Sequence, residues 1–158
     1  MKWMNKGHEY DEMYKNIEKK NRYYLFGAGD YGHQFLAMFK DEINIAGFID
    51  NSADKIGTTI EGIPCYAFND INLENDEAII LTMSQIARVK PVEQLLKSGK
   101  VHNVDYFLIE EFISLYNVYK YDKVYFSSIS FLPSTICNLN CKHCLNFNPY
   151  AKQFYVRE

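Results

Sequence analysis

The chain has 158 residues, of which 47% are hydrophobic and 16% aromatic, and its formal net charge is −3. This length suits one core-forming domain with at most part of a second, and the acidic balance without a long basic run argues against a nucleic-acid partner. No apolar run approaches the roughly 18 to 20 residues of a membrane span, and the amino terminus lacks the apolar segment of a signal peptide. We therefore expect a cytoplasmic protein without a membrane partner, whose four cysteines are thiols, metal ligands or catalytic groups rather than disulfides.

A helix and then a short buried strand are predicted near the amino terminus. Apolar residues recur at helical spacing within residues 8–20: Tyr10, Met13, Tyr14 and Ile17. Acidic side chains near the start of this range and lysines near its end suit the dipole of a helix. A run of strand-forming residues follows at Tyr23 to Phe26, and it predicts the first strand of a sheet.

Three glycines directly after that strand form the pattern G-x-G-x-x-G at Gly27, Gly29 and Gly32. The first permits a sharp turn, the second lets a phosphate approach the main chain, and the third lets a helix lie tightly on the sheet. Apolar residues at helical spacing follow the motif, so the N–H groups and dipole of that helix would face an anion. We predict a nucleotide-binding turn whose cofactor-binding residues also include Asp30 and Tyr31.

A second buried strand is predicted at Ile43 to Ile49, and it ends in Asp50 and Asn51. Asp50 lies 21 residues after Gly29, where a Rossmann fold places the acid that accepts a hydrogen bond from a ribose hydroxyl. An aspartate there would repel a 2′-phosphate and so disfavours NADP. The alternative is an ordinary strand-end turn in which the carboxylate binds nearby backbone. We assign Asp50 and Asn51 to the predicted cofactor site, and both interpretations stay open.

Residues 57–66 are predicted to cross the fold as an irregular, glycine-punctuated segment in place of the usual second helix. Pro64 limits this segment to a sheet edge or an irregular path, because proline cannot donate to a strand ladder. A short second crossover is a departure from a full dinucleotide-binding fold.

Further helices and strands alternate over the next fifty residues. In order, we predict a helical turn within 69–75, strands at 78–83 and 104–109, and a helical segment at 110–116. Between the strands, a helix capped by Ser84, kinked or restarted at Pro91 and ended by Gly99 is predicted. Its expected apolar face consists of Ile86, Val89, Leu95 and Leu96. This alternation predicts the α/β class, with a Rossmann-like parallel sheet flanked by helices over residues 1–116.

Three blocks of this first domain resemble the Rossmann-like modules found ahead of sugar-modifying and polysaccharide-biosynthesis enzymes. The blocks are Phe-Gly-Ala-Gly-Asp-Tyr-Gly at 26–32, Gly-Phe-Ile-Asp-Asn at 47–51 and Gly-x-x-Ile-x-Gly-Ile-Pro at 57–64. The resemblance spans roughly residues 22–116. It implies binding of a nucleotide, either NAD or a nucleotide-sugar, with the three glycines at the phosphate and Asp50 at a ribose or sugar hydroxyl. It does not imply hydride transfer.

A cysteine cluster follows a predicted linker at 117–123 and a predicted strand at 124–132. Cys137, Cys141 and Cys144 have the spacing C-x3-C-x2-C. Three thiolates on one loop can hold three irons of a [4Fe–4S] cluster and leave the fourth iron open.

This motif resembles the radical S-adenosylmethionine (radical SAM) superfamily, with His143 at the position of an aromatic residue. By that resemblance, Cys137, Cys141 and Cys144 ligate a 4Fe-4S cluster whose open iron binds S-adenosylmethionine. Only 14 residues follow Cys144, whereas one βα unit takes about 30. We therefore expect residues 124–158 to be the truncated beginning of a radical SAM barrel from a longer parent enzyme.

Two other interpretations of the cysteines stay open. A structural zinc ion could use the three cysteines with His143 or Cys65, although neighbouring side chains such as His143 and Cys144 seldom reach one tetrahedral ion. The cysteines could also be free thiols. Cys65 itself is most simply a small buried apolar residue.

Three functions are consistent with the sequence. The first is a nucleotide- or nucleotide-sugar-recognising module of a radical SAM enzyme, with no catalytic residues of its own and with the downstream radical SAM domain as its partner. The second is a small NAD-binding oxidoreductase or redox sensor, and the third is a ligand-free structural or interaction module. A homo-oligomer is a further possible arrangement.

Overall fold

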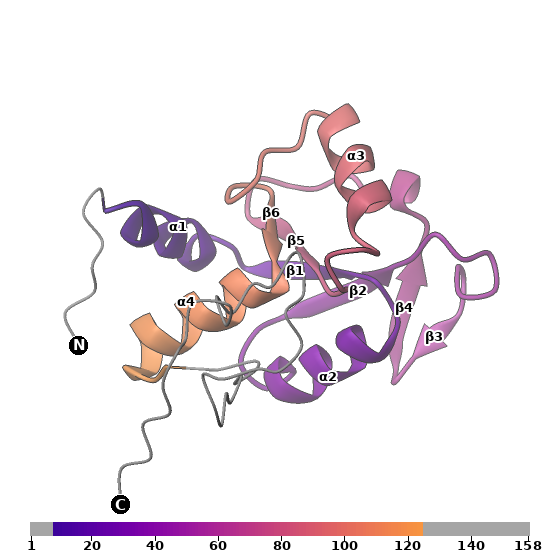
Figure 1. Ribbon diagram of the computed structural model, residues 1–158. Coiled ribbons are helices and arrows are strands. Elements are labelled where there is room, and N and C mark those ends of the chain that lie inside the picture. Colours follow the sequence, from indigo (N-terminus) through magenta and orange to yellow (C-terminus); the bar gives the residue numbers. More distant parts are fainter. Residues whose placement is uncertain (1–7, 125–158) are drawn as a thin grey trace, which may run out of the picture. The chain divides into compact units, whose positions relative to one another are not determined.

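The computed structural model describes residues 8–124, through which a six-stranded sheet runs (Figure 1). The strands are β1 (Arg22–Phe26), β2 (Ile45–Ile49), β3 (Thr59–Ile60), β4 (Ile63–Tyr66), β5 (Glu77–Leu81) and β6 (Tyr106–Leu108). The helices are α1 (Glu9–Glu18), α2 (Asp30–Phe39), α3 (Val89–Lys97) and α4 (Ile109–Tyr121), with one 3-10 turn at Phe68–Asp70.

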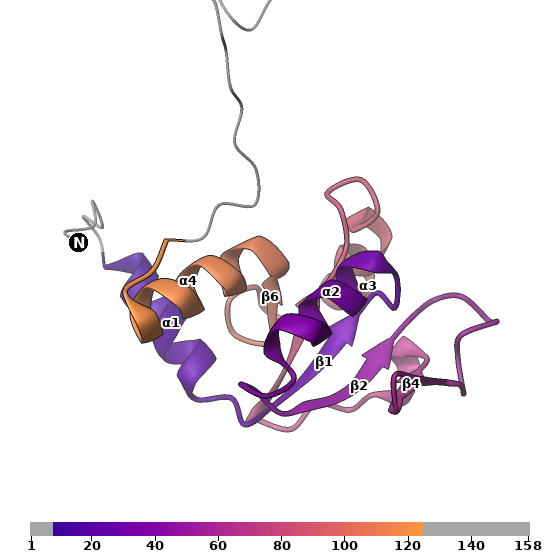
Figure 2. The ribbon, with the colours of Figure 1, turned by 90° about the horizontal axis from the view of Figure 1, so that it is seen from below.

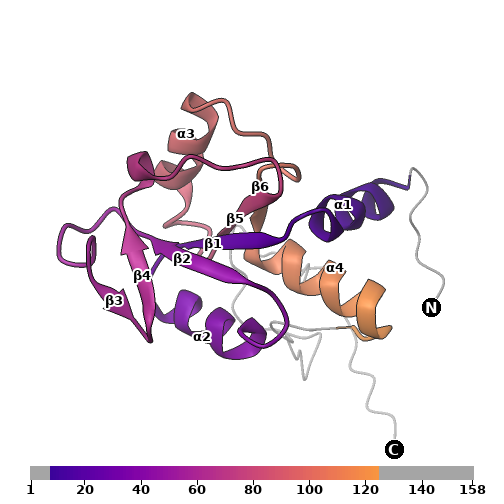
Figure 3. The same cartoon turned by 180° about the vertical axis from the view of Figure 1, so that it is seen from behind.

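The sheet has the strand order β3-β4-β2-β1-β5-β6. Every neighbouring pair is parallel except β3 with β4, which is antiparallel. Helices α2 and α4 cover one face and α3 covers the other (Figures 1 and 3). The predicted α/β class, with a Rossmann-like parallel sheet flanked by helices, is therefore confirmed for the described residues.

The two faces of the sheet bury alternate residues of β1, as the period of two in a strand requires. Tyr23 and Leu25 belong to the apolar core beneath α1, α2 and α4, whereas Tyr24 and Phe26 belong to the core beneath α3. Phe112 of α4 is fully buried at the centre of the first core. Its ring contacts five other aromatic rings: Tyr23, Phe35, Phe39, Phe107 and Tyr116.

The segment predicted to be irregular at 57–66 contains the β3–β4 hairpin, which forms one edge of the sheet (Figure 3). Its two turn residues, Glu61 and Gly62, both have positive φ (49° and 83°), as a two-residue type I′ turn requires. Pro64 pairs with β3, while Cys65 pairs with Phe48 of β2. The sequence placed Pro64 at a sheet edge or on an irregular path, and Pro64 lies in the hairpin at that edge. The hairpin itself was not predicted.

Cys65 is buried in β4, as expected of a small apolar residue. Burial raises the pKa of its thiol, which keeps it protonated at neutral pH. Within the part of the chain that the structure describes, Cys65 does not belong to any group of three or more side chains that could hold a metal ion.

The apolar face predicted for the third helix is largely wrong. Ile86, Val89 and Leu96 are exposed, and of the predicted face only Leu95 is buried. Helix α3 begins at Val89 after a turn, and its buried residues are Pro91 and Leu95, four residues apart. Ser84 Oγ lies 3.5 Å from the N–H of Ala87 and thus caps this turn rather than the helix.

Helix α4 is longer than the predicted 110–116, since it runs from Ile109 to Tyr121. Residues 117–121, predicted to lie in a linker, are helical because Tyr119 stacks on Tyr14 of α1, with 4.6 Å between the ring centroids. Figure 2 shows α1 alongside α4. The predicted cysteine ligands Cys137, Cys141 and Cys144 lie outside the described residues. Among the described helices, none has the length and apolar character required to cross a bilayer.

Candidate functional site

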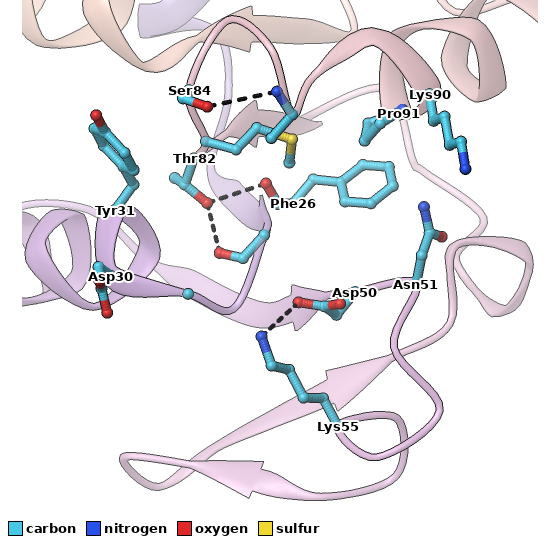
Figure 4. A pocket seen from close by; sticks show the side chains of 14 residues that line it. Phe26, Asp30, Tyr31, Asp50, Asn51, Lys55, Thr82, Ser84, Lys90 and Pro91 are labelled. Carbon is cyan, nitrogen blue, oxygen red and sulfur yellow. Dashed lines mark hydrogen bonds and ion pairs between the residues drawn. The ribbon is translucent and has the colours of Figure 1, made fainter.

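A cleft of about 380 Å³ opens at the carboxyl ends of the central strands (Figure 4). Strand β1 pairs with β2 on one side and with β5 on the other. The chain leaves β1 toward α2 on one face and leaves β5 toward α3 on the opposite face. This is the point at which the strand order reverses, where open α/β sheets bind their ligands. Six of the seven predicted cofactor-binding residues line this cleft: Gly27, Gly29, Asp30, Tyr31, Asp50 and Asn51.

The turn after β1 is held to both neighbouring strands. Gly27 has φ +115°, and its N–H donates to the carbonyl of Ile49 at 2.8 Å. The hydroxyl of Thr82, a buried residue after β5, lies 3.1 Å from the carbonyl oxygen of Phe26 and 2.9 Å from that of Gly27. A Cβ on residue 27 would lie 2.8 Å from the Thr82 carbonyl oxygen, so only glycine fits this turn.

Gly32 brings helix α2 into contact with the same turn. A Cβ on this residue would lie only 2.2 Å from the carbonyl oxygen of Gly27 and 3.1 Å from the ring of Phe48. The tight packing predicted for the third glycine is therefore present, although Gly32 does not itself line the cleft.

Gly29 is the glycine that borders open space. A Cβ on this residue would have no neighbour within 4 Å, and its φ of −111° is accessible to any residue. Gly29 caps α2, whose first N–H groups, beginning at Asp30 and Tyr31, have no partner within the helix. The main chain at the mouth of the cleft is thus accessible to a ligand, with the positive end of a helix dipole behind it.

Asp50 contacts the glycine turn directly. Its Oδ2 accepts the N–H of Ala28 at 2.9 Å, and its Oδ1 accepts the N–H of Ser52 at 2.9 Å. The second contact is the local turn that the sequence left open as an alternative, whereas the ribose contact stays a prediction. Burial raises the pKa of Asp50, but hydrogen bonds from Ser52, Ala28 and Lys55 outweigh this and hold it below its ordinary value.

Lys55 is a cleft residue that the sequence analysis did not find. Its ammonium group donates to the carbonyl oxygen of Ala28 at 2.8 Å. It also donates to Asp50 Oδ2 at 3.2 Å (Figure 4). No periodic pattern marks this lysine. Its position five residues after Asp50, in a loop that returns toward the glycine turn, is the signal that could have identified it.

The opposite wall of the cleft comes from α3 and the segment before it. Met83, Lys90 and Pro91 line this wall together with Ser84. The side-chain amides of Asn51 and Gln94 exchange two hydrogen bonds, of 2.8 and 3.2 Å, between the end of β2 and α3. Asn51 therefore joins the two walls, a contact that its place in the sequence did not indicate.

His33, which follows the glycine turn, does not line the cleft. Its Nδ1 lies 2.5 Å from Glu61 Oε1 in the turn of the β3–β4 hairpin. Within residues 8–124, no group of three or more histidine, cysteine or acidic side chains is arranged to hold a metal ion.

Residues 19–103 match the family model described as C2185-like, N-terminal, and this match covers more than half of the chain. The chain belongs to the C2185-like N-terminal family. The matched C2185-like region contains every cleft residue named above. A comparison with curated proteins gives no match.

The chain also shows a weak similarity to solved structures. UDP-D-quinovosamine 4-dehydrogenase from Vibrio fischeri is 20% identical with a TM-score of 0.40, covering 60% of this chain and 84% of that one. RSP in complex with beta-NADH is 17% identical with a TM-score of 0.40, covering 69% and 66%. RSP described as a Rex-family repressor is 16% identical with the same TM-score, covering 71% and 68%. The fold assignment rests on the sheet itself rather than on these similarities.

The glycine geometry predicts effects of different size for two alanine substitutions. Gly32→Ala should lower the free energy of unfolding by about 1–3 kcal/mol or more, because the new methyl group meets a backbone carbonyl that cannot move freely. Gly29→Ala should change it by less than about 1 kcal/mol, since the added Cβ enters open space. Urea denaturation followed by circular dichroism measures both. Equal destabilisation by the two substitutions would contradict the described packing of α2.

The contacts of Asp50 predict a specific dependence of stability on pH. Its pKa in the folded protein lies below the ordinary 3.8, so its stabilising effect is present above that pH and is lost as the pH falls through the lowered pKa. Asp50→Asn should cost about 1.5–3 kcal/mol at neutral pH, because hydrogen bonds to a charged acceptor are lost. The difference in unfolding free energy between wild type and variant should stay constant above about pH 5 and shrink below pH 3.8. A difference that persists unchanged in strong acid would contradict this role.

Proposed function

We propose that residues 8–124 form a module that binds a nucleotide or nucleotide-sugar in the cleft at the glycine turn. The observation that carries this proposal is the open space in front of Gly29, at the amino-terminal end of α2 and at the switch point of the sheet. A phosphate there would receive main-chain N–H groups and the favourable end of the helix dipole.

The walls of the cleft support a ligand that has both an anionic and an apolar part. Met83 supplies apolar surface for a base beside the buried Phe26 and Pro91, and Tyr31 is half exposed at the rim. Asp50 and Asn51 follow β2, the place from which a Rossmann fold forms hydrogen bonds with a ribose or sugar hydroxyl. A volume of about 380 Å³ lies within the range of small-molecule sites.

The module is proposed to recognise its ligand rather than to transform it. Among the described cleft residues, the acid best placed for proton transfer is Asp50, and three hydrogen-bond donors already hold its carboxylate in the ionised form. A general base needs a pKa near the working pH, and this environment lowers that of Asp50 instead.

An NAD-binding module is the second candidate, and the position of Asp50 at the end of β2 favours it. This is the place of the acid that accepts from the adenosine ribose in NAD-binding folds. The two candidates differ in the base and in the group beyond the diphosphate, so direct competition between the two ligands separates them.

We also propose that the parent protein is a radical SAM enzyme. In this proposal the boundary between the nucleotide-binding domain and the radical SAM domain follows α4, and residues 124–158 begin the radical SAM domain. This proposal rests on the sequence motif of Cys137, Cys141 and Cys144, which would hold a 4Fe-4S cluster. The cluster with S-adenosylmethionine would supply radical chemistry to the parent, and the nucleotide-binding module would present or sense a substrate.

The nucleotide proposal predicts saturable binding to the purified chain. Isothermal titration with UDP-N-acetylglucosamine, UDP, NAD and S-adenosylmethionine should give binding for a diphosphate-containing ligand. Gly29→Glu should weaken that binding by more than about tenfold, because a carboxylate then occupies the space and charge of the phosphate. Gly29→Gln separates the effect of size from that of charge. If the wild type binds none of these ligands although it unfolds cooperatively on heating, the ligand-free structural module is favoured.

The cluster proposal predicts that anaerobic reconstitution with iron and sulfide loads about four irons per chain. Cys141→Ala should abolish this loading. Cys65→Ala is the matched control and should leave it intact, since the Cys65 thiol is buried inside the sheet. Iron and sulfide analysis measures the result, and an unchanged iron content in Cys141→Ala would refute the ligand assignment.

A further inference from the structure

We propose that Lys55 makes the cleft selective for phosphorylated ligands, and that Asp50 is a positioning residue that holds Lys55 against the glycine turn. This inference rests on the proposed function and deepens it, because it names the side chain that distinguishes a nucleotide from a nucleoside. It also changes the expected role of Asp50, which the sequence assigned to a ribose hydroxyl.

The two side chains hold opposite ends of one residue. Ala28 lies between Gly27 and Gly29, its N–H donates to Asp50 Oδ2 at 2.9 Å, and its carbonyl oxygen accepts from Lys55 Nζ at 2.8 Å. The ion pair between Lys55 and Asp50, at 3.2 Å, closes the ring. The middle residue of the turn is therefore fixed before any ligand arrives.

Asp50 and Lys55 differ in the hydrogen bonds that they can still offer to a ligand. The carboxylate of Asp50 accepts hydrogen bonds on both oxygens, and its side chain is only 16% exposed. The ammonium of Lys55 has three donors, of which two are used, and its side chain is 38% exposed in the lining of the cleft. The group with a donor to spare at the turn is thus the cation.

A third donor next to Gly29 suits a phosphate oxygen. An ammonium and a phosphate that meet beside the amino-terminal end of α2 add a charge-assisted hydrogen bond to the main-chain contacts. A nucleoside, which has no phosphate, would gain nothing from this contact. Lys55 should therefore raise affinity for phosphorylated ligands only.

The chain offers a matched comparison in Lys90. This lysine lines the same cleft from α3 and carries the same charge, but it is not hydrogen-bonded to the turn. Removing either lysine changes the net charge equally, whereas only the removal of Lys55 takes a donor away from Ala28 and the expected phosphate position.

The test measures the affinity of the full chain for uridine, UMP and UDP and for adenosine, AMP and ADP by isothermal titration. Lys55→Met should weaken binding of the preferred diphosphate by about ten- to thirtyfold and that of its nucleoside by less than about twofold. Lys90→Met should cause a clearly smaller loss for the diphosphate. Lys55→Arg should retain part of the preference for the phosphorylated ligand. Asp50→Asn should reduce the same preference, because Lys55 is then no longer held.

Other outcomes would overturn the inference. Equal losses for nucleoside and diphosphate in Lys55→Met would show that Lys55 only braces the turn, and equal losses in the two lysine variants would show a general charge effect. If Lys55→Met does not fold, Lys55→Gln, which keeps a hydrogen-bond donor but removes the charge, takes its place and must also weaken the diphosphate more than the nucleoside. A wild type that binds none of these nucleotides refutes the proposed function itself, whereas nucleotide binding unaffected by Lys55→Met refutes this inference alone.

Discussion

The close approach of helix α2 to the turn after β1 is the constraint on which the site depends. Residue 32 has no room for a Cβ because the Gly27 carbonyl lies in its place. This contact sets the amino-terminal end of α2 at the mouth of the cleft, and it brings Phe35 and Phe39 onto the aromatic core around Phe112. The same glycine spacing therefore governs both the packing of the sheet face and the access to the main chain at Gly29.

Electrostatics fixes the turn that the packing creates. The hydroxyl of Thr82, after β5, bonds the carbonyl oxygens of the turn. On the other side, after β2, Asp50 accepts the N–H of Ala28 and Lys55 donates to its carbonyl oxygen. These contacts exist without a ligand, so little ordering of the turn would accompany binding, and preorganisation of this kind favours affinity. The carboxylate of Asp50 already accepts three hydrogen bonds within the protein. We therefore assign recognition of the phosphate to Lys55.

The sequence predicted the parts whose signals are local. The glycine turn, the first strand, α2 and the parallel α/β class follow from short motifs and periodicity, and they agree with the structure. The β3–β4 hairpin was missed because its turn has Glu61 where asparagine or aspartate is usual, and because Pro64 weakened the strand signal. Other features depend on contacts between distant parts of the chain, which leave no periodic signal in the sequence. They are the exposed face of α3, the length of α4 and the contacts of Lys55. An example of such a contact is the ion pair between Arg88 and Glu110, at 2.8 Å.

The most direct test of the central claim is a ¹H–¹⁵N NMR titration of the full chain with the tightest-binding nucleotide. Our account predicts that the amide resonances of Gly29, Asp30 and Tyr31 shift together and saturate with one affinity, since their N–H groups would meet the phosphate. Saturable binding that leaves these three resonances unchanged and instead shifts residues of another surface, such as Ser114 in the groove between α1 and α4, would contradict it.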